Sequence, residues 1–429
     1  MLRFRACLYI YAVAGKEIKI YSIISIGAAP VNSKNRIKRE EYKSRLRNLR
    51  NTMDENGIHV AIIQFFVDIY YFSGVNQLST LIVPLNRDPV LFVQVGLDMA
   101  KEESWIDDIR ELKGMASLET YFKEQGIVLE TIGINEDTVP ATLYRKYRET
   151  LPQAIFNNIS PHLQKIRSIK SDTEIELIKK AAEVSYSGHQ RIVDVLHEGM
   201  TELELSATVE YTTRRQGHAG CSIGRRNTYY PPAGVIGVSG PNLGIISGSG
   251  AITISGKGLS AALPMGASSR PIKYGDMIAA DISTNIDGYH SDETRMYVLG
   301  EPDDHQKRAF EMIYAAQQAA LDAIRPGVKG KDVYHAARQV VEKADYLEHF
   351  AGYSRYPQYN YLGHGVGLEA NEHPLINSHD NTILQPNMVI AVEPKLIAAQ
   401  WGVSLEDTLL ITNNGYKLLT KTKRKLVVV

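Results

Sequence analysis

Two aspartates eleven residues apart place the strongest constraint on the fold of this chain. Asp281 ends the apolar run Met277–Ala280, as a residue at the end of a buried strand would, and Asp292 follows eleven residues later. Between them, Asn285–Gly288 has the Asp-Gly chemistry of a tight hairpin turn. The pattern predicts adjacent antiparallel strands that bring both carboxylates side by side. Burying two such charges is costly unless they are paired or bind a metal.

Three more acidic or histidine positions have similar settings further along the chain. His364 lies in the glycine-rich segment 363–367, where backbone and ligand can approach closely. Glu393 follows the apolar run 388–392, and Glu406 follows a Val-Ser-Leu segment. One such residue alone is more often a turn residue or a satisfied polar group than a ligand. Four carboxylates and one imidazole together suit manganese, cobalt, iron or zinc, and bridging carboxylates can hold two ions about 3.5–4 Å apart.

The chain is long enough for two domains. Its 429 residues exceed one ordinary core, and strand-like segments alternating with helical ones predict a small α/β domain over 37–165. Capping-box signatures at Ser171–Glu174 and Thr201–Glu204 predict helix starts in the second domain, 166–429, where helices and antiparallel strands indicate an α+β architecture. We expect residues 1–36 to be a non-structural extension. Periodicity predicts helices over 39–56, 304–324 and 332–343, and strands over 60–66, 81–84, 90–95 and 132–134.

Composition excludes several function classes. Lys plus Arg and Asp plus Glu both number 48, and apart from the short tail 421–425 there is no basic stripe, so nucleic acid is not an expected partner. No apolar run approaches the roughly 20 residues that a membrane-spanning helix needs, so we expect no membrane partner. The two cysteines, Cys7 and Cys221, make no disulfide framework, which favours a reducing cytoplasm.

In order and spacing, the five candidate ligands resemble those of the pita-bread metallopeptidases, a family that includes methionine aminopeptidase, aminopeptidase P, prolidase and creatinase. The resemblance is fullest to the prolidase and aminopeptidase P branch and covers about 37–420. It implies a pita-bread catalytic domain over 166–429, preceded by a creatinase-type N-terminal domain over 37–165. The segments that carry it are 272–281, 288–295, 364–369, 392–394 and 405–408.

The resemblance also implies roles for these five residues. Asp292 and Glu406 would bridge two divalent ions, Mn, Co, Zn or Fe, which share a hydroxide as the attacking nucleophile. Asp281 would hold the first ion, while His364 and Glu393 would hold the second. Glu393 would also handle the proton of the attacking water, which suits a carboxylate beside two cations.

Some positions depart from the family pattern. Met265 and Asn371 stand where prolidase-like enzymes have histidines that position the substrate and stabilise the tetrahedral intermediate. Lys395 replaces a usual glycine after Glu-Pro. His373, two residues past Asn371, could compensate only in a remodelled loop. His290, which should face the same side of its strand as the ligand two residues on, is another candidate acid–base group, and a packing role is its alternative.

We therefore expect a cytoplasmic, homodimeric, two-metal hydrolase that cleaves Xaa-Pro or similar amide bonds of small peptides, with catalytic roles for Glu393, His373 and His290. An alternative keeps the metals but acts on a small non-peptide molecule, as an ectoine-hydrolase-like or sulfonium-lyase-like member would, because Met265 and Asn371 replace histidines. A third hypothesis, a non-catalytic binding protein on the same scaffold, is opposed by the complete set of ligands.

Overall fold

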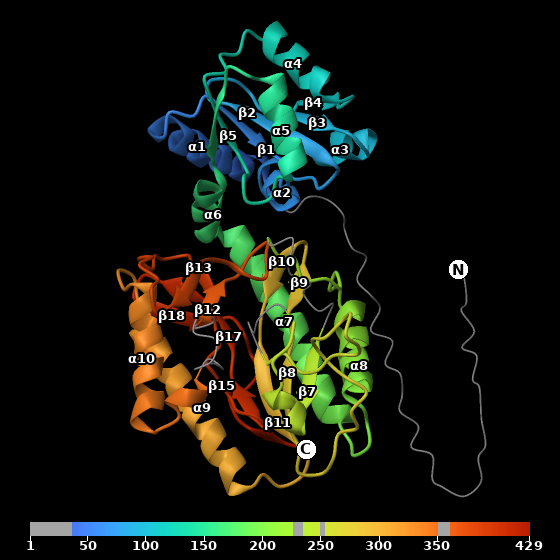
Figure 1. Cartoon of the computed structure of the whole chain (residues 1–429), viewed down its shortest axis with the longest axis vertical. Helices are drawn as coiled ribbons and strands as arrows, with labels where there is room; N and C mark the ends of the chain where they lie inside the picture. Colours follow the sequence, from blue (N-terminus) through green and yellow to red (C-terminus); the bar gives the residue numbers. More distant parts are fainter. Residues whose placement is uncertain (1–36, 226–234, 249–253, 351–360) are drawn as a thin grey trace, which may run out of the picture. The chain divides into compact units, whose positions relative to one another are not determined.

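The computed structural model describes residues 37–225, 235–248, 254–350 and 361–429 (Figure 1). The predicted extension, 1–36, lies outside the described residues. Within the described part, no helix combines the length and the apolar character needed to cross a membrane.

A six-stranded mixed sheet organises the first part of the described chain, with strand order β4-β3-β2-β1-β5-β6. Strand β1 pairs antiparallel with β2 and parallel with β5. Strands β1, β2 and β3 are buried along their whole length, which explains why they appear in the sequence as unbroken apolar runs. The strands are β1 (Val60–Ile63), β2 (Ser79–Pro84), β3 (Val90–Val93), β4 (Asp108–Glu111), β5 (Thr131–Ile134) and β6 (Ile155–Asn158).

Helices flank this sheet, and one of them stands where a strand was predicted. The apolar run 60–66 was expected to be a single strand, but the strand ends at Ile63 and a helix begins at Phe66. A short apolar run fits either state by its periodicity, and Asp68 in the first turn and left-handed Gly74 at the end favour a helix here. The helices are α1 (Arg39–Glu55), α2 (Phe66–Ser73), α3 (Leu97–Glu103), α4 (Met115–Glu124), α5 (Ala141–Thr150) and α6 (Ser160–Ser168).

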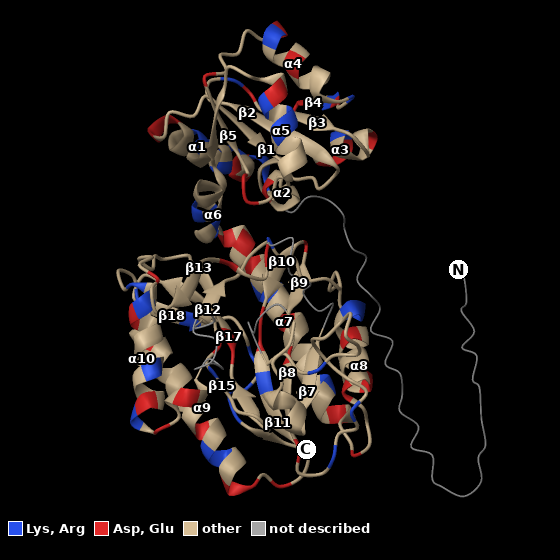
Figure 2. Ribbon diagram, in the orientation of Figure 1, with Lys and Arg blue, Asp and Glu red and all other residues tan. Residues whose placement is uncertain are grey.

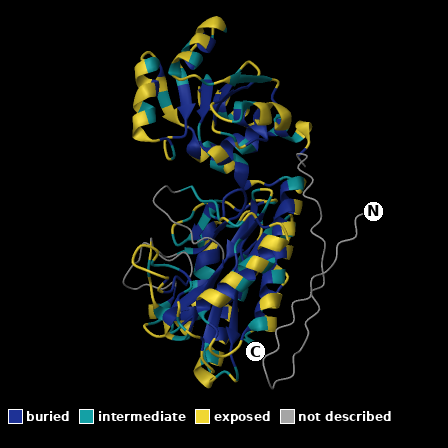
Figure 3. Cartoon of the chain, turned by 90° about the vertical axis from the view of Figure 1, so that its right-hand side faces the viewer, coloured by how far each residue is buried: buried dark blue, intermediate teal, exposed yellow. Residues whose placement is uncertain are grey.

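Longer helices follow in the second part of the chain. Both predicted capping boxes are present, at Ser171 with Glu174 and at Thr201 with Glu204, and they start α7 and α8. Figure 3 shows the helices with exposed outer faces, while the strands between them are buried. Both signs of charge alternate along α9 and α10 (Figure 2). The helices are α7 (Asp172–Val195), α8 (Glu202–Arg215), α9 (Asp304–Ala323) and α10 (Gly330–Lys343), with 3-10 turns at Gly240–Gly244 and Leu347–His349.

Two larger sheets lie between these helices (Figure 1). One has the order β19-β11-β8-β7 and the other β13-β12-β14-β17-β18, with short pairs β9-β10 and β15-β16. Apolar residues of α9, α10 and the five-stranded sheet share one core, and Ile192, Leu205 and Ile278 belong to another that joins α7 and α8 to the four-stranded sheet. The predicted α+β architecture is confirmed.

The strands of this part are β7 (Ile236–Ser239), β8 (Met277–Asp281), β9 (Thr284–Ile286), β10 (Tyr289–Ser291), β11 (Thr294–Val298), β12 (Tyr361–Gly365), β13 (Glu372–Asn377), β14 (Val389–Val392), β15 (Lys395–Ile397), β16 (Gly402–Ser404), β17 (Asp407–Thr412), β18 (Gly415–Leu418) and β19 (Val427–Val428). The predicted hairpin is the antiparallel pair of β9 and β10. Its turn residues Asp287 and Gly288 both have positive φ, 50° and 86°, as an Asp-Gly hairpin turn requires.

Candidate metal centre

Three of the five predicted ligands come from neighbouring strands of the five-stranded sheet. His364 lies on β12, Glu393 directly follows β14, and Glu406 directly precedes β17. Strand β14 lies between β12 and β17 and pairs antiparallel with both. Because Gly363, the neighbour of His364, and Asp407, the neighbour of Glu406, both pair with Val392, this register brings the three side chains to one level of the sheet.

The other two predicted ligands come from the four-stranded sheet and its hairpin. Asp281 ends β8, directly opposite Thr294 of β11, and Asp292 lies between β10 and β11. The Thr294 hydroxyl donates to Glu406 Oε2 at 2.8 Å, and Glu406 N donates to the Thr294 carbonyl at 3.2 Å. Asp292 N donates to the Thr408 hydroxyl at 2.9 Å. These bonds join the two sheets where the predicted ligands meet.

The side chains converge closely enough to hold a metal ion. Ligand atoms of Asp292, His364 and Glu406 all lie within 4.8 Å of one another, and all three residues are buried. His364 Nε2 is 3.6 Å from Glu393 Oε1 and 3.8 Å from Glu406 Oε1. His364 Nδ1 lies 3.1 Å from the Gly365 carbonyl. When Nδ1 carries the proton and donates it to that carbonyl, Nε2 keeps its lone pair directed at the carboxylates.

Burial and mutual repulsion shift the pKa values of these groups. Burial first, then the charges of Asp281 and Glu393, raises the pKa of Asp292 well above its usual range. Burial first, then Asp292, Glu393 and Asp281, does the same to the pKa of Glu406. Burial lowers the pKa of His364 to about 4, so its imidazole is neutral at pH 7 and able to bind a metal. A bound cation would relieve the repulsion among the carboxylates.

Two carboxylate oxygens of the predicted ligands also indicate that a cation can bind here. Among the described residues, Asp292 Oδ1 and Glu393 Oε1 are buried without a hydrogen-bond donor. Buried polar atoms nearly always have a partner, and leaving one unsatisfied costs about 1–3 kcal/mol. Carboxylate oxygens with one neutral imidazole suit a divalent transition metal. The residues present therefore fit such an ion. We name the five predicted ligands the ligand cluster: Asp281, Asp292, His364, Glu393 and Glu406.

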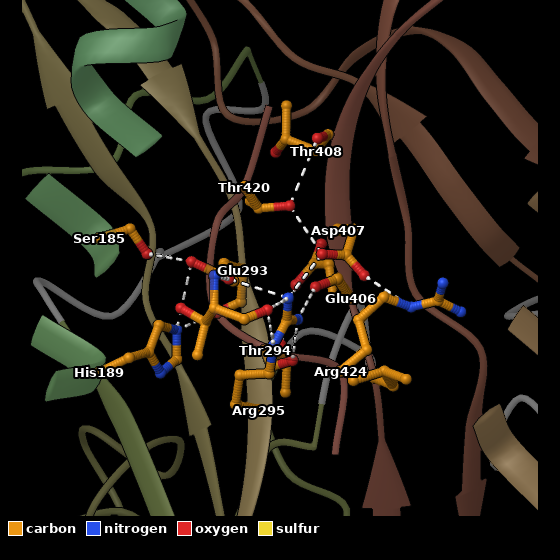
Figure 4. A network of polar contacts seen from close by, with 12 residues as sticks. Ser185, His189, Glu293, Thr294, Arg295, Glu406, Asp407, Thr408, Thr420 and Arg424 are labelled. Carbon is orange, nitrogen blue, oxygen red and sulfur yellow. Dashed lines mark hydrogen bonds and ion pairs between the residues drawn. The ribbon is translucent and has the colours of Figure 1, made fainter. Parts of the chain in front are cut away.

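A network of polar groups adjoins Glu406 of the ligand cluster (Figure 4). Arg295 is fully buried and donates to Asp407 Oδ1 at 2.6 Å and to the Glu406 carbonyl, and it lies 2.9 Å from Glu293 Oε1. Gln317 Nε2 donates to Asp407 Oδ2 at 3.0 Å. The guanidinium group of Arg295 thus offsets the negative charges of Asp407 and Glu293. This network was not predicted from the sequence, although charged residues inside buried strands indicate that a partner is near.

The two histidines predicted as acid–base groups lie in different surroundings. His290 is buried, its Nδ1 lies 3.0 Å from the Gly367 carbonyl, and its Nε2 accepts from Ile223 N at 3.1 Å. Both ring nitrogens are therefore engaged by backbone groups, and burial lowers the pKa of His290 to about 4. His373 is exposed on β13, next to the buried Glu372.

The three positions that depart from the family pattern are all described. Met265 is half-buried against Gly248, where an added Cβ would lie 3.3 Å from the Met265 sulfur. Asn371 is half-buried just before β13. Lys395 is fully buried, and its Nζ donates to Glu393 Oε2 at 2.9 Å. The sequence marks Lys395 as a departure from glycine, but this contact was not predicted.

A second group of buried charges lies around the segment between α6 and α7. Arg167 Nη1 lies 2.7 Å from Asp68 Oδ1 and 2.8 Å from Glu369 Oε1, and Lys170 Nζ lies 3.0 Å from Glu372 Oε2. Burial acts against ionisation of Glu372, but Arg167 and Lys170 outweigh it and lower the pKa of Glu372 to about 2. We name this group the junction cluster: Asp68, Arg167, Lys170, Arg225, Glu369 and Glu372.

Three buried carboxylates, one half-buried carboxylate and a buried imidazole, gathered where two sheets meet, are typical of a metal-dependent hydrolase. Comparison with known proteins identifies the family: the chain belongs to metallopeptidase family M24, whose model matches residues 176–413. The model of the creatinase/prolidase N-terminal domain matches residues 45–169. The predicted family, its fold and the class of metal-dependent hydrolase are confirmed.

Relatives match the chain along nearly its whole length. The sequence is 33% identical to an Xaa-Pro dipeptidase from Pyrococcus furiosus, over 90% of this chain and 100% of the relative. Among solved structures, a prolidase from Pyrococcus horikoshii matches with a TM-score of 0.74 and 29% identity, over 90% of this chain and 100% of its own. An Xaa-Pro dipeptidase from Bacillus anthracis matches with a TM-score of 0.78 and 25% identity, with the same coverage of each chain.

Proposed function

We propose that this protein is a metal-dependent peptidase that cleaves Xaa-Pro bonds of small peptides. The observation that carries the proposal is the ligand cluster itself, with buried carboxylates drawn from two sheets around one neutral imidazole. The names of the relatives, Xaa-Pro dipeptidase and prolidase, support the choice of substrate because they match over the whole length of those proteins.

The proposed centre holds two divalent ions, with Mn, Co, Zn or Fe as the candidates. Asp281 would hold the first ion, His364 and Glu393 would hold the second, and Asp292 and Glu406 would contribute to both. The unpartnered oxygens of Asp292 and Glu393 support this assignment. When bound, such ions polarise the scissile carbonyl and lower the pKa of a water molecule so that it can attack at neutral pH.

The side chains of this protein then have separate tasks in the reaction. Glu393 takes the proton of the attacking water, a role that suits a carboxylate beside two cations. Thr294 fixes the orientation of Glu406 through its 2.8 Å hydrogen bond. Arg295 holds the backbone of Glu406 and the carboxylate of Asp407, so the strand that carries this ligand is rigid before substrate arrives.

We propose different roles for His290 and His373. His290 connects the Gly367 carbonyl to Ile223 N, which suits a positioning residue that fixes two loops beside the centre. His373, whose ring is exposed, keeps its predicted catalytic role as a proposal, and an exposed imidazole can reach a substrate. The homodimer and the cytoplasmic location stay predictions, and sedimentation analysis would test the first of them.

The test is hydrolysis by protein stripped of metal and then reloaded with one ion at a time. We expect release of proline from an Xaa-Pro dipeptide only with a divalent ion, with Xaa-Ala as the matched control substrate. Glu406→Gln removes the charge of one proposed ligand, and we expect it to lower kcat/KM by about 10²–10³-fold, the usual loss when one preorganised electrostatic group is removed. Metal content measured by mass spectrometry should fall in parallel.

The same assay judges the second candidate, a family member that acts on a small non-peptide molecule. Met265 and Asn371, at positions where peptidases have histidines, favour this candidate. Bound metal without cleavage of any Xaa-Pro peptide would support it and contradict the proposal. A protein that binds no metal would contradict both and support a binding protein on the same scaffold.

A further inference from the structure

We propose that Glu293 is a positioning residue of the metal centre, which acts through Arg295 to fix the proposed ligands Asp292 and Glu406 relative to each other. The inference rests on the proposed metal-dependent function and adds a residue to it. Glu293 would touch neither metal nor substrate. It would act through the segments of chain that carry these two ligands.

One guanidinium group contacts the residue that follows each of the two ligands. Glu293 directly follows Asp292, and Asp407 directly follows Glu406. Arg295 Nη2 lies 2.9 Å from Glu293 Oε1 and 2.6 Å from Asp407 Oδ1. Arg295 belongs to β11 of the four-stranded sheet, whereas Asp407 begins β17 of the five-stranded sheet. Arg295 therefore joins the two sheets next to both ligands, and Glu293 orients its guanidinium group for that contact.

The carboxylate of Glu293 is held from several elements at once. Its Oε2 accepts from the Ser185 hydroxyl of α7 at 3.2 Å, and its Oε1 accepts from Thr422 N at 3.2 Å. The side chain has no exposed surface. Figure 4 shows Glu293 between Ser185 and Arg295. The Thr422 carbonyl in turn accepts from Arg295 Nη2 at 2.7 Å, so carboxylate and guanidinium are fixed together.

Arg295 is the cation on which Glu293 depends. His189 Nε2 lies 3.6 Å from Glu293 Oε2, but burial lowers the pKa of His189 well below its usual value, so this ring is neutral. Among the described residues, Glu293 therefore has a charged partner only in Arg295. Without the charge of Glu293, Arg295 would be attracted to Asp407 alone. The segment that carries Asp292 would then lose its part of the contact.

Stability alone does not account for an ion pair at this place. Replacing a buried ion pair by apolar residues of similar volume is often neutral or stabilising. What the pair of Glu293 and Arg295 supplies is direction, because charge-assisted hydrogen bonds are short and roughly twice as strong as neutral ones. Groups that orient metal ligands from outside the centre typically change metal affinity or activity by about 10–100-fold when they are replaced.

Another buried glutamate provides a matched control. Glu202 begins α8, has no exposed surface, and accepts from Ser239 N at 2.7 Å and from Asn242 Nδ2 at 2.8 Å. Ser239 pairs with Ile278, at the opposite end of β8 from Asp281. Glu202→Gln therefore removes a comparable buried charge without changing the segments that carry the ligands.

The experiment records the visible absorption spectrum of the Co²⁺-loaded protein, which depends on the number and arrangement of the ligands. In Glu293→Gln we expect the absorption maxima to shift. We also expect kcat for an Xaa-Pro dipeptide to fall by about 10–100-fold, with less than about threefold change in KM. Glu202→Gln, which we also expect to lower the free energy of unfolding, should keep the natural spectrum and the natural kcat.

The control separates positioning from a general structural role. If Glu293 only stabilised the fold, Glu293→Gln would keep the natural spectrum and kcat, and that result overturns the inference, as do equal spectral changes in both variants. Glu293→Asp, which shortens the side chain and keeps its charge, is the second variant if circular dichroism shows that Glu293→Gln does not fold, and we expect the same spectral shift.

The two proposals fail in different ways. Natural protein that binds Co²⁺ but cleaves no Xaa-Pro peptide would overturn the proposed substrate, and the spectra of the Glu293 variants would still decide this inference. Natural protein that binds no Co²⁺ would overturn both. Cleavage by natural protein, with an unchanged spectrum in Glu293→Gln, would overturn this inference alone.

Discussion

The protein buries two groups of carboxylates, and they differ in what offsets their charge. In the junction cluster, Arg167 and Lys170 lie 2.7–3.0 Å from acidic oxygens, and the pKa of Glu372 falls to about 2. In the ligand cluster, burial and repulsion raise the pKa values of Asp292 and Glu406. The first group is complete with side chains alone. The second lacks positive charge, and that deficit is what distinguishes a metal site from a structural ion-pair network.

Each cluster has one member whose surroundings differ from those of the rest of its cluster. In the ligand cluster, Lys395 already neutralises one oxygen of Glu393. In the junction cluster, Glu369 Oε2 is buried without a donor among the described residues, and burial raises the pKa of Glu369 to about 7 although Arg167 and Arg225 act against the shift. Each cluster therefore has one member that resembles the other cluster, and these members are the places to test the distinction.

The largest expected difference between the two clusters is the change in the free energy of unfolding when one charged side chain is replaced. Arg167→Met leaves several buried carboxylates without their partner, and we expect the free energy of unfolding to fall by about 3–5 kcal/mol, the usual cost of breaking a buried ion pair from one side. Urea denaturation monitored by circular dichroism measures this.

Glu406→Gln is the matched variant in the ligand cluster. In metal-free protein it removes a carboxyl group whose charge repels Asp292, Glu393 and Asp281, and it keeps an oxygen that can accept from the Thr294 hydroxyl, so we expect the free energy of unfolding to stay the same or to rise. A loss as large as that of Arg167→Met would mean that the ligand cluster is held together by its own charges, and the distinction between the clusters would be lost.

The sequence predicted the ligand cluster much better than the junction cluster. Asp281 and Glu393 end apolar runs, and His364 lies among glycines, so local patterns indicated each of them. The hairpin turn at Asp287 and Gly288 was also predicted, because its chemistry is local and fixes the register of the strands around it.

The junction cluster could not be predicted in the same way, because its members are far apart in the chain. Asp68 lies on α2, a helix that begins in an apolar run predicted as a strand. Its partner Arg167 is 99 residues away in the chain. Lys395 shows the same limit: the sequence marks it as a departure, but only the strand pairing puts its ammonium group against Glu393. Contacts of this kind depend on tertiary packing, which has no periodic signal.

The next effect in size is a pH dependence at Glu369. Its pKa is raised from the usual 4.5 to about 7 in the folded protein, so the folded state holds a proton that the unfolded state has released. Relative to Glu369→Gln, the natural protein should therefore lose stability as the pH rises from about 4.5 to 7, and the difference should be constant outside this window. We expect a change on the order of 1–3 kcal/mol, measured by urea denaturation at a series of pH values. A difference between the two proteins that does not vary with pH would show that folding does not shift the pKa of Glu369.

The smallest expected effect distinguishes a positioning residue from an acid–base group at the metal centre. Both ring nitrogens of His290 are engaged, at 3.0 Å from the Gly367 carbonyl and 3.1 Å from Ile223 N, so the ring has no free nitrogen to exchange a proton with a substrate. His290→Gln keeps a donor and an acceptor, and we expect kcat to fall less than tenfold, about 1 kcal/mol in the barrier, with the pH profile unchanged. Proton transfer by His290 would instead contribute about 10²–10⁴-fold, and its loss would remove one limb of the profile. A large loss of kcat with a lost limb would therefore show that His290 is an acid–base group. Its contacts with the Gly367 carbonyl and Ile223 N would then have to break when substrate binds.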